Sequence, residues 1–266
     1  MKRSVKVNMP QMALGCLSEN WLLKELGDFH WAKLCSSLGR GSRDLVDSQG
    51  RRLYATFVHI RIDLDSDLTA FPEGDEITFG IEMTRFGRST VQSTITFEGE
   101  KSAGSATLLT TFSVRANEGS NALLKSEPIG EFQDVVEATD ISPFFSEYST
   151  VRSEYGRSEP KHEPRPDEIY SINPYTDSNG AGLLYFAAYQ SIADLLVLRQ
   201  FPDEFDIHTK LRDIYYFKNC DLTDAMYLEP VSRITTESGA VDGQYLLYRA
   251  SDGACLAFMS TIKHAD

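Results

Sequence analysis

The stretch NPYTDSNGAGLLYFAAYQSIADLL, residues 173–196, joins a run of turn-forming residues to an apolar run with helical spacing. Its first eight residues are mostly Asn, Pro, Asp, Ser and Gly, which favour turns, and the remainder carries three aromatic side chains. The pattern predicts a buried helix that starts on a polar loop and ends near Arg199.

The same order of elements occurs in both halves of the chain. A short strand precedes the helix in the C-terminal half, and four strands are predicted after it at 210–219, 225–237, 243–250 and 254–264. The N-terminal half shows a helix at 17–38 and strands at 51–64, 75–86, 88–99 and 104–116. Gly15 and Gly180 both precede the helix of their half, and the two final strands are similar. The sequence therefore predicts an internal duplication.

A long helix followed by a meandering antiparallel sheet that wraps it is the hot dog architecture. The predicted fold class is therefore α+β, a double hot dog of two tandem repeats, which suits the thin pantetheine arm of an acyl thioester. The predicted boundaries are 1–116 for the first repeat, 117–168 for a connector and 169–266 for the second repeat. The connector is rich in Pro and acidic residues, and we expect order around Phe144 and Phe145 and mobility around Pro160 to Pro166.

Composition places the chain among ordinary globular proteins. It has 266 residues, of which 41% are hydrophobic and 24% charged, and no apolar run approaches the roughly 20 residues needed to span a bilayer. The net charge of -13 argues against nucleic acid and anionic membranes as partners, since both need a basic surface. Asn8, Pro10 and Gln11 interrupt what would be a secretory apolar core. The expected localisation is cytoplasmic.

The chain lacks the common metal and cofactor motifs. Its four cysteines, Cys16, Cys35, Cys220 and Cys255, are scattered without a CxxC pair, which favours reduced, buried thiols over a metal site. No GxSxG, P-loop, HExxH or GxGxxG motif is present. We therefore expect no metal and no cofactor, with any chemistry carried by backbone donors, amides, Tyr and His.

The loop DSNG, residues 177–180, is one candidate site. The N-terminus of a helix carries backbone N–H groups and a partial positive charge that stabilise an oxyanion. Gly180 would let a carbonyl approach the backbone, and the Asn179 amide would donate a hydrogen bond. The alternative is that Asp177, Ser178 and Asn179 only cap the helix.

Three further residues are candidates in the N-terminal half. Tyr54, in RRLYATF, offers a phenol that could accept an acyl group or donate a proton, although a strand tyrosine is more often a packing residue. His30 lies near the end of the first predicted helix, where a histidine also serves as a capping or packing group. Asn20 is a helix-disfavoured residue on an apolar helix face, so it is a candidate to point into a pocket.

The stretches Asn8 to Trp31 and Ile172 to Tyr189, with RLYATFV and RDIYYFKNCDL, resemble the bifunctional acyltransferase/decarboxylases of polyketide biosynthesis, leinamycin-pathway type. The resemblance implies a double hot dog enzyme whose substrate is methylmalonyl-CoA or malonyl-CoA. Such an enzyme forms an acyl-tyrosine, decarboxylates it and loads a propionyl or acetyl group onto an acyl carrier protein. The catalytic tyrosine falls on Tyr54, and the quoted motifs supply a pocket to which we assign Asn20, His30, Asn179 and Gly180.

Two other functions stay open. One is a hydrolytic acyl-CoA or acyl-ACP thioesterase with Asp177 as its base, and the other is a non-catalytic module that binds acyl thioesters. Carrier proteins are acidic, so docking on this acidic chain needs a local basic patch. We expect that patch among Arg40, Arg43, Arg51, Arg52, Arg85 and Arg88. Pairing into a homodimer is also left open.

Overall fold

The computed structural model describes residues 1–117, 121–205 and 207–265, and its chain forms two compact units, Met1–Ser146 and Glu147–Asp266. The division falls inside helix α2, so both units contain residues of the predicted connector. The elements of the first unit are β1 Lys2–Lys6, η1 Met9–Gln11, β2 Met12–Ala13, β3 Cys16–Leu17, α1 Glu19–Ser37, β4 Tyr54–Leu64, η2 Leu68–Ala70, β5 Glu76–Phe86, β6 Thr90–Glu98, β7 Ala103–Arg115, β8 Leu123–Lys125 and β9 Val136–Glu137.

Helix α2, Pro143–Tyr155, leads into the second unit. The elements that follow are η3 Pro166–Glu168, β10 Tyr170–Ser171, α3 Pro174–Asp177, α4 Phe186–Gln200, η4 Pro202–Glu204, β11 Ile207–Tyr216, β12 Ala225–Thr235, β13 Val241–Arg249 and β14 Cys255–Ala265. None of the described helices is both long and apolar enough to cross a membrane. All four cysteines are buried, and no disulfide joins any two of them.

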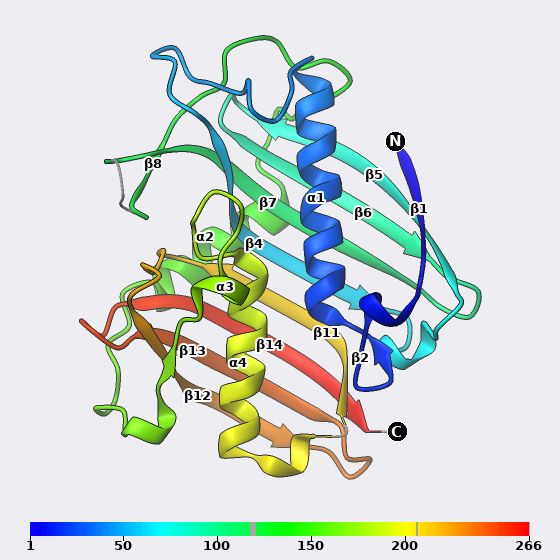
Figure 1. The fold of residues 1–266 in the computed structure, drawn as a ribbon, viewed down its shortest axis with the longest axis vertical. Helices are drawn as coiled ribbons and strands as arrows, with labels where there is room; N and C mark the ends of the chain where they lie inside the picture. Colours follow the sequence, from blue (N-terminus) through cyan, green and yellow to red (C-terminus); the bar gives the residue numbers. More distant parts are fainter. Residues whose placement is uncertain (118–120, 206, 266) are drawn as a thin grey trace. The chain divides into compact units, whose positions relative to one another are not determined.

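The two units share one strand topology. The first has the order β1-β5-β6-β7-β4 and the second the order β11-β14-β13-β12-β10, with every neighbouring pair antiparallel. In each unit, the first strand after the long helix, β4 or β11, lies beside the last long strand, β7 or β14 (Figure 1). The strand before the helix, β1 or β10, pairs with the second strand after it, β5 or β12. The predicted order of strand, loop, helix and four strands is therefore confirmed in both halves.

Each long helix lies across the sheet of its own unit (Figure 1). In the first unit Leu22, Leu26 and Phe29 of α1 are fully buried, and Phe29 meets Phe79 of β5 edge to face at 6.4 Å between ring centroids. The buried residues of β5 alternate with exposed ones, as expected for a strand with one face on the core. Each such buried Leu or Phe contributes roughly 1.5–3 kcal/mol.

Within its described residues, 117 and 121–168, the connector is more ordered than its composition predicts. Phe144 stacks on His59 at 3.7 Å, and Phe145 meets Phe86 at 5.3 Å, as expected for these two side chains. Residues 157–168, which we call the strap, were expected to be mobile around Pro160 to Pro166. Several of their backbone groups are instead hydrogen bonded to β12 and β13.

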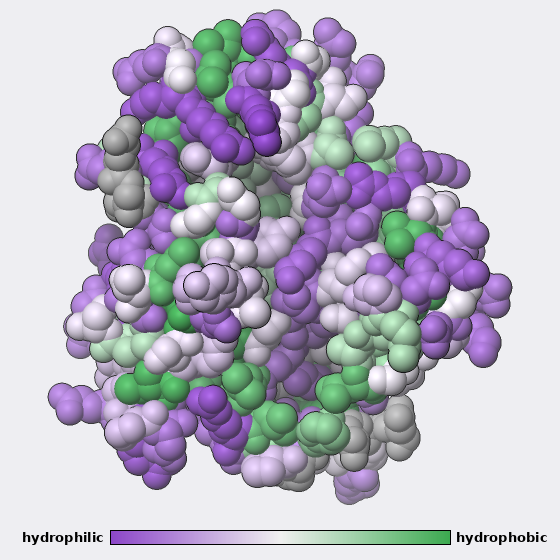
Figure 2. Space-filling view, in the orientation of Figure 1, coloured by the Kyte–Doolittle hydropathy of each residue, from purple (hydrophilic) through white to green (hydrophobic). Residues whose placement is uncertain are grey.

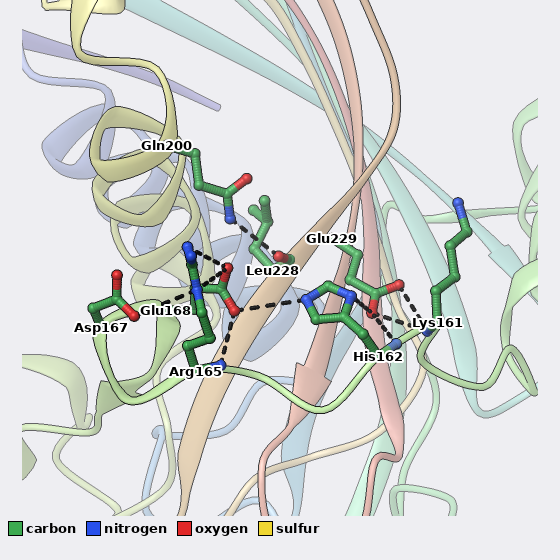
Figure 3. A network of polar contacts seen from close by, with 8 residues as sticks. All are labelled: Lys161, His162, Arg165, Asp167, Glu168, Gln200, Leu228 and Glu229. Atoms are coloured by element: carbon green, nitrogen blue, oxygen red, sulfur yellow. Dashed lines mark hydrogen bonds and ion pairs between the residues drawn. The ribbon is translucent and has the colours of Figure 1, made fainter.

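The buried carboxylate of Glu229 on β12 holds the strap (Figure 3). It accepts hydrogen bonds from the backbone N–H of Lys161 at 2.9 Å and of His162 at 3.4 Å. The His162 ring lies between two carboxylates, with Nδ1 3.2 Å from Glu229 and Nε2 3.6 Å from Glu168. A buried carboxylate without donors would be costly, so these bonds stabilise both Glu229 and the strap.

Candidate functional site

The loop before α4 is organised by Asp177, the last residue of α3. This buried carboxylate accepts hydrogen bonds from the Tyr170 hydroxyl at 3.0 Å, the Asn173 N–H at 2.8 Å and the Thr176 hydroxyl at 2.9 Å. Burial and then the bond to Asp177 raise the pKa of Tyr170 to about 12, so this phenol stays protonated and donates. The carboxylate is therefore used to fold the loop.

The side chain of Asn179 has a fixed orientation at the tip of this loop. Its Oδ1 accepts hydrogen bonds from the backbone N–H groups of Ala181 at 2.9 Å and Leu183 at 3.1 Å. Two donors require the oxygen on that side, which directs the amide NH2 the other way. In the parts of the chain that the structure describes, neither this NH2 nor the Gly180 N–H has a protein acceptor.

The surroundings of Gly180 are open. The residue is exposed, and a Cβ added to it would meet no atom within 4 Å. The tip therefore presents two hydrogen-bond donors, the Asn179 amide and the Gly180 N–H, without a side chain over the glycine. Backbone N–H groups and asparagine amides are among the donors that oxyanion holes use.

The structure corrects how this loop meets the helix. Helix α4 begins at Phe186, and its N-cap residue Tyr185 makes no side-chain cap, so the alternative that residues 177–179 cap the helix is wrong. A bridge between Ser178 and Leu184 closes the loop as a hairpin, and Gly182 takes a positive φ of 69° that favours glycine. The donors therefore come from a hairpin tip ahead of the helix.

A hairpin also precedes α1 in the first unit. Strands β2 and β3 form it, and its tip residues Leu14 and Gly15 have positive φ values of 52° and 77°. Ser18 caps α1 by accepting from the Trp21 N–H at 3.3 Å. Asn20 is half-buried in the first turn of this helix. Gly15 and Gly180 thus lie in corresponding hairpins of the two units.

Tyr54 is the first residue of β4, opposite Ser113 of β7, and is half-buried. The guanidinium of Arg52 lies 5.4 Å from the centre of its ring. Among the described residues no group hydrogen bonds to the Tyr54 hydroxyl. The contact with Arg52 is therefore to the ring of Tyr54 and leaves its hydroxyl without a protein partner in the described chain.

His30 is fully buried between α1 and the sheet of the first unit. Its Nδ1 lies 2.7 Å from the Ser93 hydroxyl and its Nε2 2.9 Å from the Thr110 hydroxyl. Burial lowers the pKa of this ring to about 3, so it is neutral at pH 7. Both ring nitrogens form hydrogen bonds inside the first unit. The assignment of His30 to a substrate site stays a prediction.

The second unit has a charged cluster at the equivalent helix–sheet contact, which sequence reasoning missed. Asp194 of α4 accepts hydrogen bonds from Arg212 at 2.8 Å, from Lys263 at 3.1 Å and from Gln190 at 2.5 Å. Burial opposes ionisation of Asp194, but the two cations outweigh it and lower its pKa to about 2. The sequence did contain a signal for this cluster. Asp194 interrupts the apolar run IADLL of α4, and Arg212 interrupts the run LRDIY of β11.

The structure thus places the predicted site residues in two sets. Asn20, His30 and Tyr54 belong to the first unit, where no hydrogen bond joins any two of them in the described chain. Asn179 and Gly180 are adjacent in the second unit. No group of His, Cys, Asp and Glu among the described residues could hold a metal ion.

Several solved structures can be superposed on nearly the whole chain. An acyl-ACP thioesterase from Bacteroides thetaiotaomicron is 12% identical with a TM-score of 0.66, covering 99% of this chain and 97% of its own. A protein from Lactobacillus plantarum assigned as an oleoyl thioesterase is 9% identical with a TM-score of 0.70, covering 99% and 95%. The 12:0-ACP thioesterase from Umbellularia californica is 12% identical with a TM-score of 0.64, covering 100% and 97%.

The fold is a double hot dog. The fold class expected from the sequence is confirmed. No protein-family model and no curated protein matches the chain. None of these three structures is an acyltransferase/decarboxylase, so that family is not confirmed for this double hot dog protein.

Proposed function

We propose that this double hot dog protein hydrolyses acyl thioesters. The observation that carries the proposal is the pair of donors at the hairpin tip, the Asn179 amide and the Gly180 N–H, which have no protein acceptor among the described residues. Three solved structures with this fold over nearly the full chain bear thioesterase names, which supports the proposal.

The proposed chemistry follows from the donors. Water adds to the thioester carbonyl, and the oxygen that becomes negative accepts hydrogen bonds from Asn179 and Gly180. The C–S bond then breaks and the sulfur takes up a proton that the water has lost, so the free acid and the thiol leave. We assign Asp177 a scaffold role and not that of a base, because its oxygens accept hydrogen bonds from Tyr170, Asn173 and Thr176.

Acyl transfer with decarboxylation is the second candidate. It is favoured by the position of Tyr54, whose hydroxyl has no hydrogen-bond partner among the described residues and whose ring lies beside the Arg52 guanidinium. The Tyr54 hydroxyl would add to the thioester carbonyl of methylmalonyl-CoA or malonyl-CoA, and its proton would pass to the sulfur, so that CoA would leave as a thiol. The acyl-tyrosine would lose CO2, and a carrier-protein thiol would take the propionyl or acetyl group and release the tyrosine.

The first prediction tests the proposed oxyanion donors with the variant Asn179→Asp. Aspartate keeps the oxygen that accepts from Ala181 and Leu183 but removes the amide donor, so the loop should stay folded. We expect kcat for acyl-CoA hydrolysis to fall by about 100-fold, the usual loss for one oxyanion donor. Thiol release from malonyl-, methylmalonyl- and decanoyl-CoA is the measurement, with intact mass of the enzyme recorded in parallel.

Matched tyrosine variants complete the experiment. Tyr54→Phe and Tyr175→Phe each remove one hydroxyl, and Tyr175 is 96% exposed, so it serves as the control. Hydrolysis predicts that neither changes the rate. An acyl-enzyme mass that vanishes only in Tyr54→Phe, together with CO2 release, would replace hydrolysis by acyl transfer. Binding of acyl-CoA without turnover would leave a binding module.

A further inference from the structure

Two buried hydroxyl groups of the second unit have no hydrogen-bond partner in the protein. Tyr245 on β13 is 1% exposed, and Thr261 on β14 is 2% exposed. Among the residues that the structure describes, no group hydrogen bonds to Tyr245 Oη or to Thr261 Oγ1. A buried hydroxyl without a partner lowers the stability of a fold, so two neighbouring ones point to a ligand that both can bind.

The register of the sheet places both hydroxyls beside the Asp194 cluster. Thr261 lies opposite Arg212 of β11 and opposite Gly243 of β13, so these three residues form one row on the same face of the sheet. Tyr245 is two residues beyond Gly243 and shares that face. Because Arg212 binds Asp194 of α4, this face is the one that the helix covers (Figure 1).

Gly243 makes room for the Tyr245 hydroxyl in this row. A Cβ on Gly243 would lie 2.4 Å from Tyr245 Oη, closer than a real Cβ can approach. The phenol therefore extends back along β13 and places its hydroxyl over the glycine, next to Thr261. Strand β14 lies between β11 and β13, so Thr261 has Arg212 on one side and the Tyr245 hydroxyl on the other. A glycine at this position indicates a built arrangement of the three polar groups.

The ion pairs of the cluster involve more positive than negative charge. Arg212 and Lys263 both pair with the single carboxylate of Asp194, at 2.8 and 3.1 Å, so these three groups carry one positive charge in excess. The next ion pair in the same row is balanced, because Arg233 opposite Gly243 pairs with Glu204 at 2.7 Å, listed here for completeness of the row. Buried charge is costly unless it is paired, so a ligand with one negative charge would neutralise the cluster.

The cluster meets solvent at the border of α4. Arg212 and Lys263 have side chains that are only 1% and 9% exposed, whereas the Asp194 side chain is 27% exposed. The outward residues of α4 include Ser191 and Leu195, and hydrophilic and hydrophobic side chains are mixed over this part of the surface (Figure 2). A small anion would therefore enter beside Asp194.

We propose that the second unit binds a carboxylate between α4 and its sheet. The carboxylate oxygens accept hydrogen bonds from the hydroxyls of Tyr245 and Thr261, and its charge balances the excess on Arg212 and Lys263. A carboxylate fits this site because it only accepts hydrogen bonds, whereas hydroxyls, guanidinium and ammonium groups all donate. A free small acid and the far end of an acyl group offer the same carboxylate, and the test separates these two sources.

The test measures thermal unfolding of the full chain in sodium formate and in sodium chloride at equal concentration and neutral pH. Formate is the smallest carboxylate, and chloride gives the same ionic strength. At about 100 mM salt we expect the Tm of the wild type to be roughly 2–4 °C higher in formate, as for a site that is mostly occupied. Tyr245→Phe and Thr261→Val each remove one of the two hydroxyls and should lose most of this difference.

Tyr248→Phe is the matched control. Tyr248 is also on β13 and 1% exposed, but its hydroxyl donates to the Glu159 carbonyl at 3.4 Å. This variant removes a buried hydroxyl from the same strand and should keep the wild-type difference in Tm. If Tyr245→Phe does not fold, Thr261→Val gives the same comparison, because valine has nearly the shape of threonine.

Two outcomes overturn the inference. Equal Tm values in formate and chloride would mean that the two hydroxyls bind no carboxylate and share only water. A difference that all three variants keep would mean that formate acts elsewhere.

The source of the carboxylate is identified with stable amide analogues of succinyl-CoA and butyryl-CoA, in which nitrogen replaces the sulfur. A larger rise in Tm with the succinyl analogue, lost in Tyr245→Phe, assigns the carboxylate to an acyl group, and equal rises assign it to a free small acid. No part of the test needs turnover, so the inference stands or falls separately from thioester hydrolysis.

Discussion

At the scale of single residues, the two hot dog units hold their long helices with different polar groups. His30 sits in a neutral hydrogen-bonded set with Ser93 and Thr110. The Thr110 hydroxyl also lies 3.4 Å from the Val91 carbonyl, so we assign Nε2 as the donor to Thr110 and Nδ1 as the acceptor from Ser93. A protonated ring could no longer accept from Ser93, because both nitrogens would then be donors.

This arrangement makes the first unit sensitive to acid. The pKa of His30 is about 3 in the folded chain and about 6.5 when unfolded, so the unfolded state binds the extra proton between these values. Stability from this residue is therefore complete above about pH 6.5 and is lost as the pH falls toward 3. Between pH 7.5 and 5 we expect a loss of about 2 kcal/mol in the free energy of unfolding.

The second prediction is that His30→Gln removes this dependence. Glutamine can also donate and accept, so the variant should lose roughly 1–3 kcal/mol at pH 7.5 and show a smaller change at pH 5. Urea unfolding at both pH values is the measurement. His264→Gln on β14 is the matched control and should keep the wild-type difference, whereas an unchanged difference in His30→Gln would mean that another group titrates.

At the scale of elements, the hairpin before α4 is a folded unit and not a helix cap. Its base is held by Asp177 and its tip by Asn179, so the two residues of one short motif have separate tasks. The positive φ of Gly182 belongs to the turn, whereas Gly180 has no such requirement. A Cβ at position 180 would touch no protein atom. The remaining reason for a glycine there is room for the carbonyl of a substrate.

The third prediction distinguishes Asp177 as a scaffold from Asp177 as a base. The side-chain oxygen of an asparagine can still accept from Tyr170 and Asn173. The rate of thioester hydrolysis by Asp177→Asn should therefore stay within a few-fold of the wild-type rate, because the hydrogen bonds that fold the loop are kept. Asp177→Ala leaves three donors without their acceptor and should lose about 1–3 kcal/mol of stability. Activity and thermal unfolding of both variants are the measurements.

A general base would give a different pattern. If Asp177 took the proton from water, Asp177→Asn would lose activity as completely as Asp177→Ala, at full stability. The pH–rate profile adds a second readout, because a base limits the acid limb of the profile. An acid limb present in wild type and absent in Asp177→Asn would contradict the scaffold role.

At the scale of the whole molecule, the duplicated fold could be predicted from the sequence because its signals are local. Strand alternation, apolar helix spacing and glycine turns repeat in both halves, and the structure has helices and strands close to those ranges. The hot dog topology then follows from the order of elements alone. Asn8 to Trp31 and Ile172 to Tyr189 each form a hairpin followed by a helix.

The candidate site was less predictable, because its properties depend on contacts far apart in the sequence. Nothing local in GDFHW shows that His30 meets Ser93 and Thr110, 63 and 80 residues away. The Asp194 cluster likewise joins α4 to Arg212 and Lys263. The donors of Asn179 and Gly180 were expected from the motif, but their place at a hairpin tip depends on the bridge from Ser178 to Leu184.

The strap has a consequence for proteolysis. A protease cleaves a segment that can unfold locally and extend into its active site. Around the Lys161–His162 peptide bond, the N–H groups of both residues donate hydrogen bonds to Glu229, so this segment is held in place. We predict that trypsin cuts slowly after Lys161 in the native chain and at least about tenfold faster in Glu229→Ala. Glu237→Ala, at an exposed glutamate beyond β12, should match wild type by mass spectrometry of the fragments. A proline-rich segment that looks like a flexible linker would then be a protease-resistant part of the second unit.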